Sequence, residues 1–552
     1  MIAFLIENMA PIMFVALVVF LLLGYPVAFS LGAVGLLFAF LGIELGQFHP
    51  NFLQALPERV YGVMNNDTLL AIPFFTFMGL VLERSGMAED LLDTIGQLFG
   101  TVRGGLAYAV IFVGALLAAT TGVVAASVIS MGLISLPIML RYGYDRRVAS
   151  GVIAASGTLA QIIPPSLVLI VMADQLGRSV GDMYEGAFIP GLVLTGLYAI
   201  YILIVSLLFP KATPGLPPEA IGFREDNGNR GLASLGVLAL ASVGFAWFMM
   251  RNSETRGADF VVISMMYGIL FAFAIAVLNW VVHRVSGVRF LSRIAQQTTF
   301  VMVPPLFLIF LVLGTIFIGV ATPTEGGAMG ATGALLLGAA KKRLSWDLVR
   351  QAVHSTAKLS AFVIFILVGA RVFSLTFYGV NGHVWVEHLL TSLPGGQFGF
   401  LIFVNIFVFI LAFFLDFFEL AFIIIPLLGP AATSLGIDLI WFGVILGVNM
   451  QTSFMHPPFG FALFYLRSVA PKESYIDRVT HKRMDAVTTG QIYWGAVPFV
   501  IIQVVMVLLV IAFPSMVMHY KGADTNVDLN KVKIELPQIE LPPLDFGPPK
   551  IQ

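Results

Sequence analysis

Two acidic residues stand close together inside an apolar stretch of this chain. Asp416 and Glu419 lie within Phe414–Phe422 (FLDFFELAF), three positions apart, so both carboxylates share one face if the segment is helical. An ionised carboxylate in the middle of a membrane costs about 2.5 kcal/mol or more, so such a pair is expected to persist beside a cation or a proton. The alternative is a hydrated position near the membrane surface.

Further polar segments are suited to binding a cation. Helix breaks expose backbone carbonyl oxygens, and prolines that lack an N–H leave more of them free. The expected cation ligands, beside the two acids, are Thr120, Thr121, Gly122, Ser127, Gly157, Thr158, Pro164, Asn449, Gln451, Thr452, Ser453 and Pro457, and Gln161 lies in the same break as Thr158. The structural alternative is that the prolines only kink helices and the hydroxyls pack against neighbouring helices.

An anionic ligand would need positive potential. Arg371 is embedded in an apolar run, and an intramembrane arginine is a functional candidate by default. A half-helix that begins near Ser166, after the first break, can point its amide groups at a carboxylate. His456, directly before Pro457, is suited to carry a proton. These three residues are the expected substrate-binding residues, with a scaffold ion pair as the alternative for Arg371 and a hydrogen-bonding role as the alternative for His456.

The helix-breaking residues repeat along the chain. Pro137 and Pro430, Gly143 and Gly436, Asp145 and Asp438, Pro164 and Pro457, and Pro165 and Pro458 are each separated by 293 residues. The pattern predicts two related halves, 1–209 and 297–519. The hairpin tips are expected at about 118–127 and 414–421, and the helix breaks at about 157–166 and 449–458. Residues 210–296 form an insert with two extra spans, and 520–552 form a polar, proline-rich tail.

Basic residues predict that the two halves face opposite ways, since Lys and Arg mark cytoplasmic loops. Arg141, Arg146 and Arg147 follow the first hairpin, whereas the equivalent loop 434–440 has no basic residue. Four equivalent loop pairs exchange their charge bias in this way. The N-terminus and the tail are therefore expected in the periplasm, in an architecture of inverted repeats with broken helices that is typical of secondary transporters.

The composition agrees with a membrane protein. Of the 552 residues, 58% are hydrophobic and 11% charged, against roughly 25% charged in soluble domains. Apolar runs of helical length predict an all-α protein with about 12–14 spanning or re-entrant segments. The net charge of −1 gives no case for binding nucleic acid, and the absence of cysteine excludes disulfides and Cys-based metal sites.

With these segments identified, the chain resembles the large membrane (M) subunit of tripartite ATP-independent periplasmic (TRAP) transporters. The motifs that carry the resemblance are Gly319–Met329 (GVATPTEGGAM), Ala154–Val168 (AASGTLAQIIPPSLV) and Asn449–Leu466 (NMQTSFMHPPFGFALFYL). The last of these, together with FLDFFELAF, is similar to the branch described for mannitol or chloroaromatic compounds. Thr322, Pro323 and Glu325 in the first motif predict a helix start with a capping box.

The resemblance implies an elevator-type importer of small organic acids in the bacterial inner membrane. Na⁺ would be the coupling ion, with H⁺ as a second possibility, and no cofactor or other metal is implied. The implied partners are a periplasmic substrate-binding (P) protein and a separate small four-helix membrane (Q) subunit. The insert and the two acids at the second tip depart from the common family pattern.

Two other functions are weighed against this one. A stand-alone cation-coupled organic-anion carrier or exporter would need no binding protein, and the sequence alone does not distinguish it. An intramembrane enzyme is disfavoured because the chain contains no HExxH, GxSxG or P-loop motif. The chain is therefore expected to be a transporter and not an enzyme.

Overall fold

Apolar helices make up most of the protein, as expected where backbone groups must satisfy their hydrogen bonds inside lipid. The computed structural model describes residues 2–121, 124–225, 228–253, 255, 257–477 and 479–520, with the backbone only for 120, 121 and 257–259. The expected tail therefore lies outside the described residues from Lys521 on. Within these described ranges, eight helices are long and apolar enough to span a membrane, or up to 11 if each of three bent helix pairs is one span. The all-α membrane class is confirmed.

The first part of the chain forms helices up to residue 208, including three short 3₁₀ helices (η). Their bounds are α1 (Ile2–Glu7), α2 (Met9–Leu22), α3 (Val27–Glu44), η1 (Pro50–Ala55), α4 (Leu56–Met64), η2 (Asp67–Leu70), α5 (Ala71–Arg84), α6 (Met87–Phe99), α7 (Gly105–Thr121), α8 (Val124–Arg141), α9 (Arg146–Thr158), η3 (Leu159–Gln161), α10 (Leu167–Leu176) and α11 (Val180–Leu208).

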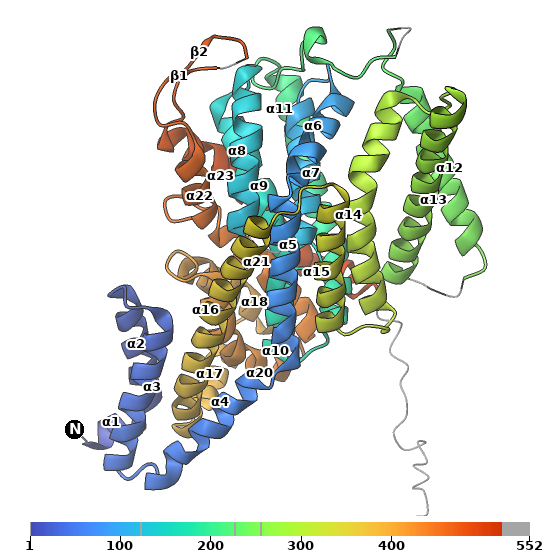
Figure 1. Ribbon diagram of the computed structural model, residues 1–552. Coiled ribbons are helices and arrows are strands. Elements are labelled where there is room, and N and C mark those ends of the chain that lie inside the picture. Colours follow the sequence, from blue (N-terminus) through green and yellow to red (C-terminus); the bar gives the residue numbers. More distant parts are fainter. Residues whose placement is uncertain are drawn as a thin grey trace, which may run out of the picture. The chain divides into compact units, whose positions relative to one another are not determined.

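The insert contributes two long helices, close to where the sequence predicts them. They are α12 (Leu232–Met250) and α13 (Gly257–Ser286), after the short η4 (Pro218–Ala220). Figure 1 shows them beside α14 (Arg293–Phe317), on the side away from α2 and α3. Much of their surface is exposed, with Leu240 at 75% and Trp247 at 65%, as expected for helices that face lipid or a partner.

The second part repeats the helix pattern of the first and adds one two-stranded hairpin. After α14 come α15 (Pro323–Ala340), α16 (Trp346–Gly379), α17 (Gly382–Thr391), α18 (Gly396–Leu411), α19 (Phe417–Ile423), α20 (Ile425–Ser434), α21 (Leu439–Ser453), α22 (Phe461–Val469), β1 (Tyr475–Ile476), β2 (Arg483–Met484), α23 (Thr489–Ala512) and α24 (Ser515–Met518). The strands β1 and β2 are antiparallel, a small exception to the all-α prediction.

Equivalent elements of the two parts share local geometry. Gly143 and Gly436 both adopt positive φ angles, of 84° and 71°. The aspartates two residues further on, Asp145 and Asp438, each cap a helix, accepting hydrogen bonds from the backbone N–H groups of the second and third residues of α9 and α21. Both double-proline peptide bonds are cis. The repeat predicted from the prolines and glycines is therefore also a repeat of backbone structure.

The two parts run in opposite directions. The backbone N–H of Asp145 donates to the carbonyl of Ala212, just beyond the C-terminal end of α11. At the start of α21, by contrast, Gly443 lies against Met183 in the first turns of α11, where an added Cβ would come within 2.7 Å of the methionine. Because α11 has 29 residues, its ends are about 43 Å apart. The starts of α9 and α21 therefore lie on opposite sides of the protein, which is the arrangement of inverted repeats.

Four helices, which we call the platform, pack as two close pairs. These are α3, α5, α15 and α16, with α3 against α16 and α5 against α15. A Cβ on Gly35 would lie 2.9 Å from the backbone of Phe373, and the Thr376 hydroxyl donates to the Gly35 carbonyl. Small residues let helix backbones approach closely in membranes, where lipid provides no hydrophobic drive for association.

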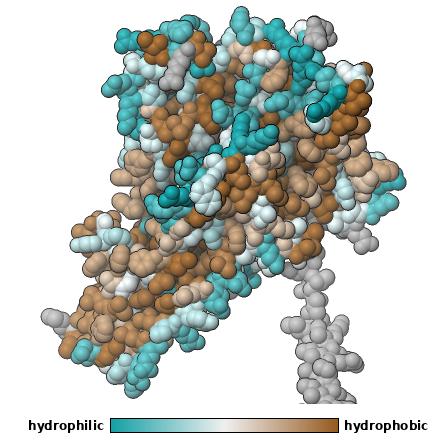
Figure 2. Space-filling view, in the orientation of Figure 1, coloured by the Kyte–Doolittle hydropathy of each residue, from teal (hydrophilic) through white to brown (hydrophobic). Residues whose placement is uncertain are grey.

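The surface divides as a membrane protein requires. Figure 2 shows hydrophobic residues over most of the visible outer surface, with hydrophilic residues gathered near helix ends, for example around β1 and β2. Ion pairs join loops that the basic-residue pattern assigns to one side: Lys341 and Arg343 pair with Asp90, and Arg141 pairs with Asp477. The structure therefore brings together the loops that the sequence predicts to be cytoplasmic.

Candidate functional site

One cavity collects both hairpin tips and both helix breaks. This cavity, which we call the tip cavity, has a volume of about 280 Å³. Its lining comes from the start of α8, from η3 and the start of α10, from α16, from the start of α19, and from the end of α21 and α22. The sequence predicts that the inverted repeat brings these segments face to face, and the described part of the structure places them so.

Asp416 lies on the wall of the tip cavity, at the N-cap of α19. Its Oδ1 accepts a hydrogen bond from the Glu419 backbone N–H at 2.9 Å, and Glu419 Oε2 accepts one from the Asp416 N–H at 2.9 Å. This reciprocal arrangement is a capping box, which satisfies two otherwise unpaired helix donors. The two acids therefore organise the second tip, and Asp416 presents a carboxylate to the cavity.

Glu419 turns toward a second, smaller space. This cavity, of about 240 Å³, lies between the second tip and the residues Tyr25–Phe29 at the start of α3. The same capping box occurs at Thr322 and Glu325, where the sequence predicts it, and that prediction is confirmed. At Asp416 the spacing of the two acids was predicted to place them on one helix face, and the capping box was not predicted.

Gln161 provides a polar group opposite Asp416. It ends η3 in the first break, is 1% exposed, and lines the tip cavity. Neither its Oε1 nor its Nε2 has a hydrogen-bond partner among the described residues. The neighbouring Ser166 donates its hydroxyl to the Gln161 carbonyl at 2.7 Å, so Ser166 stabilises the break instead of pointing a free hydroxyl at a ligand. A buried, unpaired amide beside a carboxylate suits a polar or cationic ligand.

A cluster of amides surrounds Thr158. Gln451 Nε2 and Gln503 Nε2 lie 3.2 Å and 3.4 Å from Thr158 Oγ1, and Gln503 also donates to the Tyr198 hydroxyl at 2.8 Å. The Oε1 atoms of both glutamines are buried without a partner among the described residues. Thr158 and Gln451 are among the residues predicted from the sequence, but Gln503 is not, although its position inside the apolar run 499–513 was an available signal.

The second break begins later than the sequence predicts. Asn449, Thr452 and Ser453 belong to α21, and the chain leaves the helix only after Ser453. Thr452 and Ser453 donate their hydroxyls to carbonyls of their own helix, because a helix interior offers those acceptors one turn back. Asn449 donates to the backbone and side-chain oxygens of Asn405 in α18, a residue that the sequence analysis does not name. The break therefore spans 454–460 instead of starting at 449.

His456 packs among aromatic rings. Its imidazole stacks on Phe413 with ring centroids 3.8 Å apart and meets Phe409 edge-on at 5.1 Å. Both ring nitrogens are buried without a partner among the described residues, and His456 does not line the tip cavity. Arg371 also lies elsewhere, on α16 nine residues beyond Phe362, in a cavity described below.

The first tip is only partly described. Gly122 lies outside the described residues, as do the side chains of Thr120 and Thr121. Ser127 is fully buried in α8. Gly157 has no space for a side chain, because an added Cβ would lie 2.4 Å from Val128 of α8. The end of α9 therefore packs directly on the first hairpin. Pro164 and Pro457 stand in the turns that follow α9 and α21.

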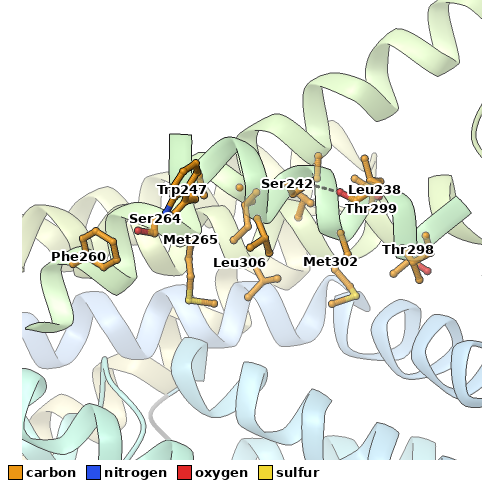
Figure 3. A pocket seen from close by; sticks show the side chains of 18 residues that line it. Leu238, Ser242, Trp247, Phe260, Ser264, Met265, Thr298, Thr299, Met302 and Leu306 are labelled. Atoms are coloured by element: carbon orange, nitrogen blue, oxygen red, sulfur yellow. Dashed lines mark hydrogen bonds between the residues drawn. The ribbon is translucent and has the colours of Figure 1, made fainter. Parts of the chain in front are cut away.

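An apolar groove in the insert has a different character. It has a volume of about 540 Å³ and lies between α12, α13 and α14, as Figure 3 shows. Its lining is almost entirely hydrocarbon, and the hydroxyls of Ser242 and Thr299 donate to carbonyls of their own helices. The groove presents no charged side chain to an ion.

Re-entrant hairpins, broken helices and inverted repeats, arranged around a largely apolar cavity that holds Asp416 and Gln161, are the architecture of membrane transporters. The family model described as "Tripartite ATP-independent periplasmic transporter, DctM component" matches residues 14–220 and 231–516. The chain belongs to this family. It is therefore a multi-pass transporter component and not an enzyme, and the resemblance seen in the sequence motifs is confirmed.

Several characterised relatives cover most of the chain. The C4-dicarboxylate TRAP transporter large permease protein DctM of Pseudomonas aeruginosa is 27% identical over 85% of this chain and 89% of its own length. The sialic acid TRAP transporter permease protein SiaT of Haemophilus influenzae is 23% identical over 91% of this chain and 67% of its own length. The crystal structure of the Alcanivorax borkumensis YdaH transporter, at 13% identity, covers 85% of this chain and 90% of its own with a TM-score of 0.47.

Proposed function

We propose that this chain is the large membrane subunit of a sodium-coupled importer of a small organic acid. A periplasmic binding protein delivers the acid, and a separate small four-helix membrane subunit completes the complex in the bacterial inner membrane. Membership of a tripartite family supports the two partners. The names of relatives, which include C4-dicarboxylate, sialic acid and isethionate transporters, support an organic anion as substrate.

The convergence of the tips and breaks on the tip cavity is the observation that carries this proposal. Asp416 supplies a carboxylate there, and Gln161 supplies an unpaired amide oxygen. Unwound carbonyls and helix ends are the usual ligands of coupling ions in such transporters. In this scheme Asp416 and the exposed carbonyls of the breaks bind Na⁺, while Thr158, Gln451 and Gln503 hold the centre of the site together. H⁺ is the alternative coupling ion.

The movement proposed is a slide of the hairpins and broken helices along the platform. Cavities line the seam between α16 and the second hairpin: the tip cavity, the smaller one beside Glu419, and the chamber around Arg371 all include α16 residues. Sparse packing along one face of α16 contrasts with the backbone contacts that hold α16 to α3. A sliding surface must exchange its contacts, whereas a fixed one gains from close packing. In the proposed orientation the N-terminus is periplasmic.

Sodium-driven uptake into proteoliposomes tests the proposal. The chain is reconstituted with its small membrane partner, and uptake of an acid bound by the cognate binding protein is measured with and without an inward Na⁺ gradient. Asp416→Asn keeps an N-cap residue, because Asn caps as well as Asp, but removes the charge. Loss of a charged ligand contact costs about 1.5–3 kcal/mol, so uptake at limiting Na⁺ should fall about 10–100-fold.

Glu325→Gln is the matched control, because it changes an acid in an equivalent capping box outside the tip cavity. That variant should transport like the unmodified protein. Wild-type uptake by Asp416→Asn would remove Asp416 from the coupling site. Uptake that needs no binding protein would instead favour the second candidate, a stand-alone organic-anion carrier.

A further inference from the structure

Two arginines face a polar chamber on the seam, separate from the tip cavity. This arginine chamber has a volume of about 290 Å³. Arg59 of α4 and Arg371 of α16 contribute its positive charge, Tyr378, Ser374 and Gln175 add polar groups, and the rest of the lining is apolar. Both arginines line this one chamber together with Tyr378, so the two guanidinium groups border the same space.

Asp174 and Glu387, which line the adjoining chamber, form no ion pair with these arginines. Asp174 accepts hydrogen bonds at 2.7 Å from the side-chain amides of Asn66 and Gln175, and Glu387 accepts one from the Ser434 hydroxyl. Neither Arg59 nor Arg371 forms a hydrogen bond or ion pair with the residues that the structure describes. Two cations beside one chamber therefore lack partners within the described part of the chain, a situation that favours binding of an anion.

The chamber lies toward the side of the protein that is periplasmic in the proposed orientation, where an imported acid would enter. Arg371 is nine residues beyond Phe362, the α16 residue of the tip cavity, which is about 14 Å along the helix. The adjoining larger chamber, of about 710 Å³, shares Arg371 and Tyr378 and reaches Leu439 at the start of α21. In the proposed orientation, that end of α21 is periplasmic.

From this arrangement we infer that the arginine chamber is the receiving site for the organic acid, distinct from the cation site around Asp416. A carboxylate binds Arg371, and Arg59 holds a second anionic or polar group, so small dicarboxylates bind more tightly than monocarboxylates of similar size. Guanidinium groups pair with carboxylates in a bidentate geometry, which gives direction as well as charge. The inference rests on the proposed import of an organic acid and assigns where that acid is first held.

Ligand-dependent thermal unfolding of the full chain with its small membrane partner, in lipid nanodiscs, tests the inference. The probes are acetate, lactate, benzoate, succinate, 2-oxoglutarate and glucarate, each titrated at constant Na⁺. At least one dicarboxylate should stabilise the unmodified protein. Arg371→Gln should weaken its apparent affinity about 10–100-fold and Arg59→Gln about 3–10-fold, because Arg59 is exposed and its charge is partly screened.

Two further variants make the outcomes distinct. Arg371→Lys retains the charge without the planar fork, so it should fold and bind with intermediate affinity. Arg251→Gln removes an exposed arginine that packs over Phe248 at the end of α12, and should bind like the unmodified protein. Unchanged affinity in both Arg371→Gln and Arg59→Gln would overturn the inference, as would failure of every acid to stabilise the unmodified protein.

The same measurement separates this inference from the proposed function. Na⁺ titrated without any acid should stabilise Arg371→Gln as it does the unmodified protein, but should not stabilise Asp416→Asn. If Na⁺ has no effect on the unmodified protein while the arginine variants lose acid binding, the receiving site stands and sodium coupling falls. If Na⁺ acts as expected while the arginine variants bind acid normally, sodium coupling stands and the receiving site is overturned.

Discussion

Gln451 Nε2 lies 3.2 Å from Thr158 Oγ1, and these two residues are each other's equivalents in the two repeats, 293 positions apart. In an object with two-fold symmetry, only residues on the axis can contact their own counterparts. The pseudo-two-fold axis between the halves therefore passes through this hydrogen bond. The contact joins the ends of α9 and α21, directly before both breaks, so it fixes the position of one break relative to the other.

Removal of either partner of this hydrogen bond should destabilise the protein, and the two losses should not be additive. Thr158→Val keeps the shape of the side chain, and Gln451→Leu removes the amide. Each should lower the free energy of unfolding by about 1–3 kcal/mol, since a buried partner is left unpaired. In the double variant the losses should not add, with a coupling energy of about 1 kcal/mol. Denaturant unfolding of the purified complex measures all three.

Thr195→Val provides the control for the hydroxyl, because Thr195 donates only to a carbonyl of its own helix. It should change stability by less than about 0.5 kcal/mol. Strictly additive losses from Thr158→Val and Gln451→Leu would show that the two side chains do not interact in the folded protein.

The sequence predicts the repeat well because prolines and glycines constrain the backbone locally. Gly143 and Gly436 require positive φ angles that other residues rarely adopt, so their spacing records the fold directly. The exchange of basic loops predicts for a similar reason that the two halves face opposite ways, since the charge of each loop depends only on its own residues. The approximate places of the helix breaks and of the two insert helices follow from such local signals.

Contacts between distant residues are harder to predict. Nothing in the sequence near Gln503 indicates that it reaches Thr158, and Asn405 gives no local sign that it holds Asn449. The end of α21 is another example, because four of the five residues Asn449–Ser453 are polar and yet the whole segment stays helical, with Thr452 and Ser453 donating their hydroxyls to carbonyls of their own helix. These contacts and this helix end are set by tertiary packing, which depends on which helices become neighbours in the fold.

Asp477 should be important for the loop between α22 and α23. It is 3% exposed, pairs with Arg141 at 3.0 Å, and accepts hydrogen bonds from the Thr480 N–H and hydroxyl. Asp477→Asn should lower the free energy of unfolding by about 1.5–3 kcal/mol, the usual range for hydrogen bonds to a charged group. Asp485→Asn is the matched control, since Asp485 also pairs with an arginine, Arg146, but is exposed. This variant should lower the free energy of unfolding by less than about 1 kcal/mol.

The same aspartate predicts a pH dependence. Burial acts to raise the pKa of Asp477, but the hydrogen bonds from Thr480 and the Arg141 charge outweigh it and lower the pKa from 3.8 to about 2. A carboxyl whose folded-state pKa is depressed stabilises the fold above its unfolded value and loses that contribution as the pH falls toward the folded value. Unfolding midpoints measured from pH 5 to pH 3 should therefore decrease less in Asp477→Asn than in the unmodified protein. Parallel curves would contradict this assignment.

Accessibility labelling can test the orientation, because the sequence contains no cysteine that would react in the background. Arg103 lies between α6 and α7, and Ser392 lies in the equivalent connection between α17 and α18. A membrane-impermeant maleimide applied to the periplasmic side should label Ser392→Cys in intact spheroplasts. It should label Arg103→Cys only after the membrane is permeabilised. Labelling of both from one side would contradict inverted repeats, and the reversed pattern would contradict a periplasmic N-terminus.

A bridge across the seam should stop transport if the second hairpin slides along the platform. The rings of Phe362 in α16 and Phe418 in α19 lie 6.3 Å apart, one on each side of the seam. A short bifunctional thiol reagent that joins Phe362→Cys to Phe418→Cys should abolish uptake, and a reagent with a cleavable disulfide should allow recovery on reduction. The matched pair is Phe29→Cys with Phe365→Cys, whose rings lie 5.1 Å apart between α3 and α16 within the platform. Bridging that pair should leave uptake intact, because α3 and α16 are expected to move together. If the bridge at Phe362 and Phe418 leaves uptake unchanged, the hairpin does not slide past α16, and the movement must occur at another interface.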